Sequence, residues 1–167
     1  MELLILSDTH GKKSRVREVL EKTSPDAVLF LGDGLRDVES ADLSCPLFAV
    51  RGNCDWTAFA DAPDERLEVF GGVRVFLTHG HRYGVKSGQG ALLAAAARQN
   101  ADVLLYGHVH EAHEEWLPKG AETAAGPLQK PLLVACPGSL GEPRRGAPSF
   151  ATLTVKNGVP LIGFGNL

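Results

Sequence analysis

Five short apolar runs along the chain are each followed by side chains of the kinds that bind divalent metal ions. The runs occupy residues 3–6, 27–31, 48–50, 73–77 and 103–105. Because they are short and continuously apolar, we interpret them as strands that are buried on both faces of a sheet. The side chains that follow them are, in chain order, Asp8 with His10, Asp33, Asn53, His79, and His108 with His110.

The place of these side chains directly after the strands predicts that they meet. In open α/β sheets, ligands bind in the crevice beyond the carboxyl ends of the strands, so residues far apart in sequence converge there. A glycine stands beside each of the later candidates, where the backbone must come close to its neighbours. We therefore predict one site formed by seven side chains that lie between positions 8 and 110.

The length and the pattern of the first half indicate one domain of the α/β class. The chain has 167 residues, of which 44% are hydrophobic, and this suits one domain over residues 1–167 with a sizeable core. In the first half, the strands alternate with helices expected over about 13–22 and around 37–41, and Ser14 is the expected N-cap of the first helix.

The second half of the chain is expected to be mainly strands. Gly71-Gly72 predicts a tight hairpin, and Asn157-Gly158 predicts another, while Pro160 places the final strand at the edge of a sheet. The segment 118–131, rich in Gly, Ala, Pro and Lys, is expected to be an exposed loop. An alanine-rich helix is expected at 91–98. The remaining elements are expected to be strands, at 103–106, 112–117, 132–136, 150–155 and 159–164.

Composition excludes several classes of partner. A formal net charge of −3 offers no basic face, so specific nucleic-acid binding is not expected. Three widely spaced cysteines without a Cys-x-x-Cys pair argue against a disulfide framework and for a reducing compartment. No apolar stretch approaches the roughly 20 residues that span a bilayer, and Met1-Glu2 leads straight into a strand instead of a signal peptide. We expect a cytoplasmic protein that does not contact membranes.

The five motifs taken together resemble a known superfamily. Asp8-x-His10, Gly32-Asp33, Gly52-Asn53, His79-Gly80-His81 and Gly107-His108-Val109-His110 occur in this order. This set resembles the calcineurin-like metallophosphoesterase superfamily, and within it the small bacterial and archaeal phosphodiesterases that carry Gly-Asn-Cys-Asp. The resemblance implies the metallophosphoesterase fold, an α/β four-layer α-β-β-α sandwich of two mixed sheets, with a dinuclear metal centre at the strand ends.

The resemblance also implies how the seven side chains share two ions. One ion would be held by Asp8, His10, Asp33 and His110, and the other by Asp33, Asn53, His79 and His108, with Asp33 as the bridge. Carboxylate, amide oxygen and imidazole suit manganese, which we expect, and also iron, zinc, nickel or cobalt. A metal-bridging hydroxide would then attack the phosphorus of a small phosphate ester, chiefly a phosphodiester and secondarily a phosphomonoester.

Three further residues are candidates for the chemistry itself. His81 is expected either to stabilise charge on the phosphoryl oxygens or to support the metal ligands, and a solvated or core histidine is the alternative. Many relatives place a histidine where this chain has Cys54, and that histidine can protonate the leaving group. A thiol beside two cations loses its proton more readily, and a thiolate cannot act as an acid. In the alternative, Cys54 only packs, and a water molecule or Asp55 supplies the proton.

Other functions remain open at this point. The runner-up is a scaffold that keeps this fold for protein interaction, as in the retromer subunit that looks like the same family. Loss of metal ligands is the expected mark of that class, whereas all seven candidate positions are filled here. A metallo-β-lactamase type of hydrolase would need an aspartate at the position of Tyr83. The resemblance also leaves a homodimer open. Ser139 is expected in a polar loop, and contact with the substrate is the alternative for it.

Replacing Cys54 with histidine (C54H) is expected to raise the hydrolysis of alkyl phosphodiesters, because the imidazole can protonate a poor leaving group. The measurement compares an alkyl with an activated aryl phosphodiester in the variant and in the unmodified chain. An unchanged rate on the alkyl ester would contradict this reading of Cys54.

Overall fold

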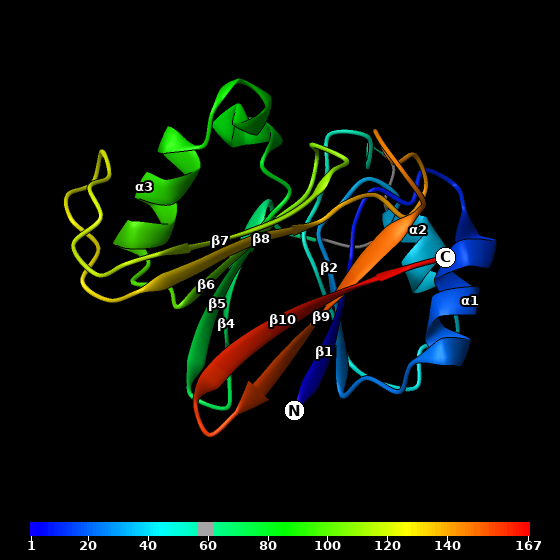
Figure 1. Ribbon diagram of the computed structural model, residues 1–167. Coiled ribbons are helices and arrows are strands. Elements are labelled where there is room, and N and C mark those ends of the chain that lie inside the picture. The colour runs from blue at the N-terminus through cyan, green and yellow to red at the C-terminus, as the bar shows by residue number, and fades with distance from the viewer. Residues whose placement is uncertain (57–61) are drawn as a thin grey trace.

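Two five-stranded sheets form the body of the molecule in the computed structural model, which describes residues 1–56 and 62–167 (Figure 1). The first sheet contains β1 (Glu2–Leu6), β2 (Ala27–Phe30), β3 (Leu47–Ala49), β9 (Ser149–Lys156) and β10 (Val159–Asn166). The second contains β4 (Glu65–Phe70), β5 (Val73–Thr78), β6 (Val103–Tyr106), β7 (Ala112–Leu117) and β8 (Leu132–Pro137). The helices are α1 (Lys13–Lys22), α2 (Leu35–Glu39) and α3 (Gly90–Arg98), with the 3-10 turns η1 (His81–Tyr83) and η2 (Val85–Ser87).

Both sheets are mixed. The strand order of the first sheet is β10-β9-β1-β2-β3, in which β1, β2 and β3 are parallel and β9 runs antiparallel to both of its neighbours. The order of the second is β4-β5-β6-β8-β7, in which β5, β6 and β8 are parallel and the two edge strands are antiparallel. The predicted metal-binding side chains follow five of these six parallel strands, all except β8.

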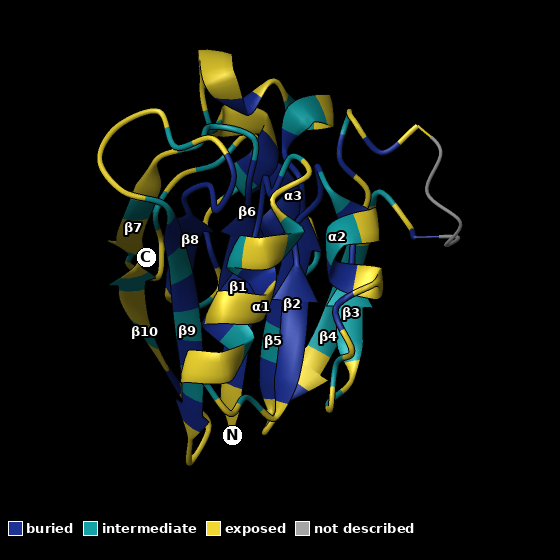
Figure 2. Cartoon of the chain, turned by 90° about the vertical axis from the view of Figure 1, so that its right-hand side faces the viewer, coloured by how far each residue is buried: buried dark blue, intermediate teal, exposed yellow. Residues whose placement is uncertain are grey.

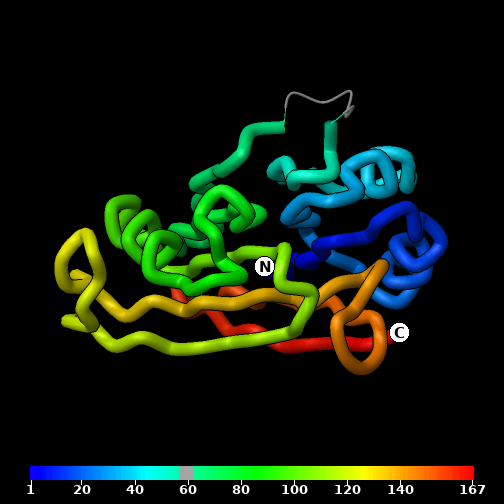
Figure 3. Tube along the Cα trace, turned by 90° about the horizontal axis from the view of Figure 1, so that it is seen from above, coloured from blue at the N-terminus to red at the C-terminus, as the bar shows by residue number. Residues whose placement is uncertain are grey.

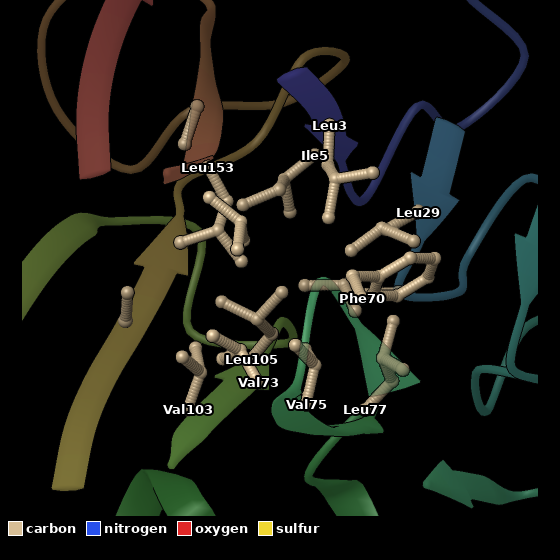
Figure 4. Close-up of a cluster of buried hydrophobic side chains, with 14 of the residues drawn as sticks. Leu3, Ile5, Leu29, Phe70, Val73, Val75, Leu77, Val103, Leu105 and Leu153 are labelled. Atoms are coloured by element: carbon tan, nitrogen blue, oxygen red, sulfur yellow. The ribbon is translucent and has the colours of Figure 1, made fainter. Parts of the chain in front are cut away.

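Three apolar clusters fill the spaces between four layers. The central cluster lies between the sheets and includes Leu3 and Leu29 from one sheet and Val75 and Leu105 from the other (Figure 4). A second cluster lies between the first sheet and helices α1 and α2, and a third lies between the second sheet and α3. Figure 1 shows these helices on the two outer faces. The predicted four-layer α-β-β-α sandwich is therefore confirmed.

Strand β1 shows why the runs are continuously apolar. Leu3 and Ile5 belong to the cluster between the sheets, whereas Leu4 and Leu6 belong to the cluster under α1 and α2. All four side chains are fully buried, and the central strands are dark blue in Figure 2. Because successive side chains of a strand point to opposite faces, a strand covered on both sides needs apolar residues at every position.

Both predicted hairpins are present. Gly71 and Gly72 join β4 to β5 with φ angles of 54° and 85°, and Asn157 and Gly158 join β9 to β10 with φ angles of 53° and 75°. Glycine and asparagine tolerate this left-handed backbone region. Pro160 lies on β10, which is an edge strand as predicted.

Two local predictions differ from the structure. Helix α1 begins at Lys13, and its N-cap is Lys12, which makes no side-chain capping hydrogen bond, so Ser14 is not the cap. Leu128 in the segment 118–131 is buried in the cluster under α3, so this loop is only partly exposed. Within the described part of the chain, no helix combines the length and the apolarity that crossing a bilayer requires.

Truncating a leucine between the sheets is expected to be costly. Leu29 is fully buried, so L29A should lower the free energy of unfolding by about 2–5 kcal/mol, because it removes apolar contacts and leaves a cavity. The matched control is L161A on β10, where the side chain is 59% exposed and the expected loss is below about 0.5 kcal/mol. Urea denaturation measures both, and equal losses would contradict this description of the core.

Candidate metal centre

The seven predicted side chains lie on loops that directly follow β1, β2, β3, β5 and β6. Five of them have positive φ angles without being glycine: Asp8 (54°), His10 (44°), Asp33 (60°), His108 (71°) and His110 (58°). This region is sparsely populated by non-glycine residues and costs of order 1–3 kcal/mol each. Such strained positions persist where the surrounding structure holds them and tend to cluster at functional sites.

Backbone hydrogen bonds hold these loops against one another. Asp8 N donates to Gly32 O at 2.9 Å, and His10 N donates to Asp33 O at 3.2 Å, which joins the loop after β1 to the loop after β2. In the second sheet, Gly107 N donates to His79 O at 3.3 Å. The strained conformations are therefore fixed by neighbouring main chain.

The first group of candidate metal-binding side chains consists of Asp8, His10 and His110, whose ligand atoms all lie within 4.8 Å of one another. Asp8 Oδ1 is 3.0 Å from His110 Nε2 and 3.8 Å from His10 Nε2, and the two imidazole Nε2 atoms are 3.3 Å apart. This spacing leaves a point between the three side chains where each can contribute one ligand atom to a cation.

The second group consists of Asp33, His79 and His108, within the same 4.8 Å limit. His79 Nε2 lies 3.4 Å from Asp33 Oδ2 and 3.2 Å from Asn53 Oδ1, which adds the amide to this group. Asp33 Oδ2 also lies 3.9 Å from His10 Nε2 in the first group. The structure thus brings all seven side chains together, and Asp33 lies between the two groups.

Two histidines are oriented by backbone carbonyls. His79 Nδ1 lies 2.7 Å from Leu31 O, and His110 Nδ1 lies 2.7 Å from Glu142 O. A carbonyl oxygen only accepts, so each Nδ1 carries the hydrogen and each Nε2 presents its lone pair to the site when the ring is neutral. This arrangement is the usual way in which the partner of one ring nitrogen fixes the other as a metal ligand.

The Asp8 carboxylate provides the test of whether these residues fit a metal ion. Asp8 is fully buried, and its Oδ2 accepts hydrogen bonds from Ser7 Oγ at 2.5 Å and from His108 N at 3.0 Å. Its Oδ1 is buried without a hydrogen bond of good geometry, although His110 Nε2 is only 3.0 Å away. Two facing lone pairs at that distance require a proton or a cation between them. The donor set therefore fits a cation.

Local charges favour the ionised form of Asp33. Burial raises the pKa of this carboxyl, but the hydrogen bond and charge of His79 and the N–H of Cys54 together bring it well below its usual range. A carboxylate that stays ionised over the whole physiological pH range is suited to bind cations.

The Asp55 carboxylate joins the loop after β2 to the loop after β3. It is buried and accepts four backbone hydrogen bonds: from Asp33 N at 2.8 Å, Gly34 N at 2.8 Å, Leu35 N at 3.0 Å and Gly52 N at 2.9 Å. These bonds fill the acceptor positions of both oxygens. Asp55 therefore fixes the backbone on which Asp33 is carried.

His81 and Cys54 lie beside the two groups. The ring of His81 is half-buried, with its centroid 5.3 Å from that of His79 and 6.1 Å from that of His108. Burial, together with the charge of His79, lowers its pKa. The Cys54 thiol is exposed and accepts a hydrogen bond from Asn53 Nδ2 at 3.2 Å. Desolvation of the thiol by the surrounding protein, together with its hydrogen bond to Asp33 and the charge of that carboxylate, raises the pKa of the thiol to about 11.

The sequence did not reveal every residue that supports the site. Ser7 donates to Asp8, and its only sequence signal is its place next to a candidate ligand. Ser139, expected in a polar loop, is fully buried and donates to Asp8 O at 2.8 Å. In Figure 3 the orange segment after β8 lies beside the blue N-terminal loop, and Arg15 Nη1 donates to Leu140 O at 3.0 Å there.

A pocket of about 240 Å³ opens next to the first group. His10, Asp33 and Cys54 line it, together with Arg36 at the start of α2. Arg36 could not be predicted from the sequence, because an exposed arginine in a helix has no distinguishing pattern. The pocket places a cationic side chain and the metal-binding groups around the same space.

Comparison with known proteins shows the family of this chain. The calcineurin-like phosphoesterase superfamily domain matches residues 1–158. The chain belongs to this superfamily. It is 31% identical over 166 residues to the probable metallophosphoesterase YsnB of Bacillus subtilis, covering 98% of this chain and 90% of that protein. It is 30% identical over 135 residues to the phosphodiesterase YfcE of Escherichia coli, covering 66% of this chain and 70% of that protein.

The fold also matches a solved structure of Vacuolar Protein Sorting 29 from Cryptosporidium parvum. The TM-score is 0.70 at 18% identity, and the match covers 99% of this chain and 97% of the other. At this identity the likeness concerns the fold alone. Membership of the calcineurin-like phosphoesterase superfamily, with Asp and His groups placed for metal binding, is consistent with use of divalent metal by this chain.

Replacing Asp55 with asparagine (D55N) is expected to loosen the loop that carries Asp33. The amide nitrogen cannot accept hydrogen bonds, so two of the four backbone N–H groups would lose their acceptor. The free energy of unfolding should therefore fall by about 2–4 kcal/mol, and the affinity for Mn²⁺ should fall as well. Urea denaturation and titration calorimetry measure the two effects.

The matched control for this change is D64N. Asp64 pairs with Arg82 at 2.8 Å, and the Arg82 side chain is 67% exposed. Losing an exposed pair of this kind should cost less than about 1 kcal/mol. If D55N were as stable as D64N, the role of Asp55 in holding the two loops would be wrong.

Proposed function

We propose that this chain is a phosphodiesterase that depends on two divalent metal ions. The observation that carries the proposal is the arrangement of two compact groups of ligand atoms, in which Asp33 of the second group lies 3.9 Å from His10 of the first. One ion would be held by Asp8, His10, Asp33 and His110. The other would be held by Asp33, Asn53, His79 and His108. Manganese is the ion we expect.

When bound, such a pair of ions supplies Lewis-acid charge at the phosphate and lowers the pKa of water. The protein's own groups would then orient the substrate. His81 stands beside both His79 and His108, where its imidazole can face the phosphoryl oxygens. Arg36, which lines the adjacent pocket, places positive charge where an anionic ester would enter.

The four backbone donors to Asp55 bear on proton transfer. An oxygen atom that already accepts two hydrogen bonds from fixed N–H groups is poorly placed to carry a proton to a leaving group. We therefore assign Asp55 a positioning role. Cys54 has no role as general acid in this proposal, because a thiol beside two cations would lose its proton and a thiolate cannot donate one. The chain would then hydrolyse phosphodiesters with good leaving groups faster than alkyl phosphodiesters.

The scaffold reading has one observation in its favour, the fold match to Vacuolar Protein Sorting 29. That match shows only that the architecture is shared. A scaffold has no need of strained backbone at five of seven metal-binding positions, or of carbonyls that fix the tautomers of His79 and His110. These features favour the hydrolase.

Removing one ligand from the second group tests the proposal. N53A and H79A are expected to lower turnover of bis(para-nitrophenyl) phosphate by Mn²⁺-loaded protein at least about 100-fold, because ligand loss should cost more than the 10- to 100-fold typical of supporting residues. Treatment with EDTA should abolish turnover, and Mn²⁺ should restore it.

The control is H113A, on the outer strand β7 and in neither group of ligand atoms. It should retain the activity of the unmodified chain. Circular dichroism confirms that each variant is folded. Full turnover by folded N53A and H79A, or turnover that survives EDTA, would overturn the assignment of the site.

A further inference from the structure

Cys54 belongs to a group of three ligand atoms on the pocket side of the centre. One ring nitrogen of His10, one carboxylate oxygen of Asp33 and the Cys54 sulfur all lie within 4.8 Å of one another. These three residues also line the pocket of about 240 Å³. Cys54 is exposed, so its sulfur is accessible to an ion that enters from solvent.

Two contacts hold the cysteine in this position. Cys54 N donates to Asp33 Oδ1 at 2.7 Å, so the residue's main chain is fixed against the same carboxylate. Asn53 Nδ2 donates to Cys54 Sγ at 3.2 Å, which directs the sulfur toward the side chains of the centre. These two hydrogen bonds fix the position of the Cys54 sulfur relative to the other two ligand atoms.

A second observation points to a cation beside His10. Asp8 Oδ1 is fully buried, has no hydrogen bond of good geometry and lies 3.8 Å from His10 Nε2. Leaving a buried carboxylate oxygen unsatisfied is costly, and a cation, or a proton shared with His110 Nε2 at 3.0 Å, would satisfy it. His10 therefore belongs both to the group of ligand atoms that contains Asp8 and to the group that contains Cys54.

Sulfur changes which ion the centre prefers. Thiolate favours soft or borderline ions such as Zn²⁺ and Cd²⁺, whereas carboxylate and amide oxygens suit Mn²⁺ and Mg²⁺. In tetrahedral sites, Zn–S bonds are about 2.3 Å and Zn–N bonds about 2.0–2.1 Å long, so three donors within 4.8 Å need only small shifts to bind one ion.

We infer that Cys54 is a metal ligand, which with His10 and Asp33 holds a thiophilic divalent cation such as Zn²⁺ or Cd²⁺. On binding, the S–H bond breaks, a sulfur–metal bond forms and the proton leaves to solvent, without any change of oxidation state. The inference builds on the proposed function, because His10 and Asp33 are shared with the first ion of the pair. A thiophilic ion at this position therefore competes with Mn²⁺.

Cadmium binding provides a test that does not depend on catalysis. Cd²⁺ is titrated into the purified, metal-free full chain while the thiolate-to-cadmium charge-transfer absorption in the ultraviolet is recorded. The unmodified chain should develop this band to saturation at one sulfur per chain. C54S should lose it, with circular dichroism confirming the fold.

The matched control is C45S, because Cys45 is a second partly accessible thiol that packs against the cluster under α1 and α2. C45S should keep the band. Equilibrium dialysis adds a second measurement. C54S should lower the preference for Zn²⁺ over Mn²⁺ at least about 100-fold, because loss of a ligand should exceed the 10- to 100-fold typical of supporting residues.

The outcomes separate this inference from the proposed function. A band that persists in C54S, or no band in the unmodified chain at saturating Cd²⁺, overturns the role of Cys54 as a ligand. A band that depends on Cys54 in a chain without phosphodiesterase activity supports the metal site and counts against the proposed function alone.

Discussion

The site depends on one buried carboxylate that binds main chain rather than metal. Asp55 accepts hydrogen bonds from backbone N–H groups on both sides of the crevice, those of Asp33, Gly34 and Leu35 after β2 and that of Gly52 after β3. These bonds hold Asp33 in a left-handed backbone conformation and Gly52 in close contact with it. A Cβ atom on Gly52 would lie 2.1 Å from Asp33 Oδ1, so the two loops leave no space for a side chain there.

The same principle of backbone support extends through the centre. Leu31 O and Glu142 O orient His79 and His110, and Ser139 holds the main chain of Asp8. The donors and acceptors that make these contacts come from both sheets and from the loop after β8. Packing of the four layers therefore fixes the ends of the parallel strands of both sheets, where the site lies. The apolar core between the sheets holds the two sets of strand ends at a constant separation.

Much of the fold and of the candidate site could be predicted from the sequence, because these features depend on the types and spacing of side chains. The apolar runs, the two hairpins and the seven metal-binding residues each carry a local pattern, and the fold and the convergence follow from the rule that parallel strands end at a common edge. The contacts of Asp55, the carbonyls behind the histidines and the burial of Ser139 could not be predicted. They involve backbone groups far apart in the chain, and backbone groups leave no pattern in a sequence. Leu128 and Ser14 were misjudged for a related reason, since packing and capping depend on neighbours that a local pattern does not specify.

The strained loops have a consequence for stability. Five of the predicted metal-binding residues occupy a backbone region that non-glycine residues seldom adopt, and Asp8 holds a buried oxygen without a hydrogen bond of good geometry. Both features weaken the folded chain by itself, and a cation that satisfies the ligands would offset them. Because metal affinity is then also folding free energy, the melting temperature becomes a gauge of occupancy. Melting temperatures recorded with different ions would rank those ions by their affinity for the folded chain, without any substrate.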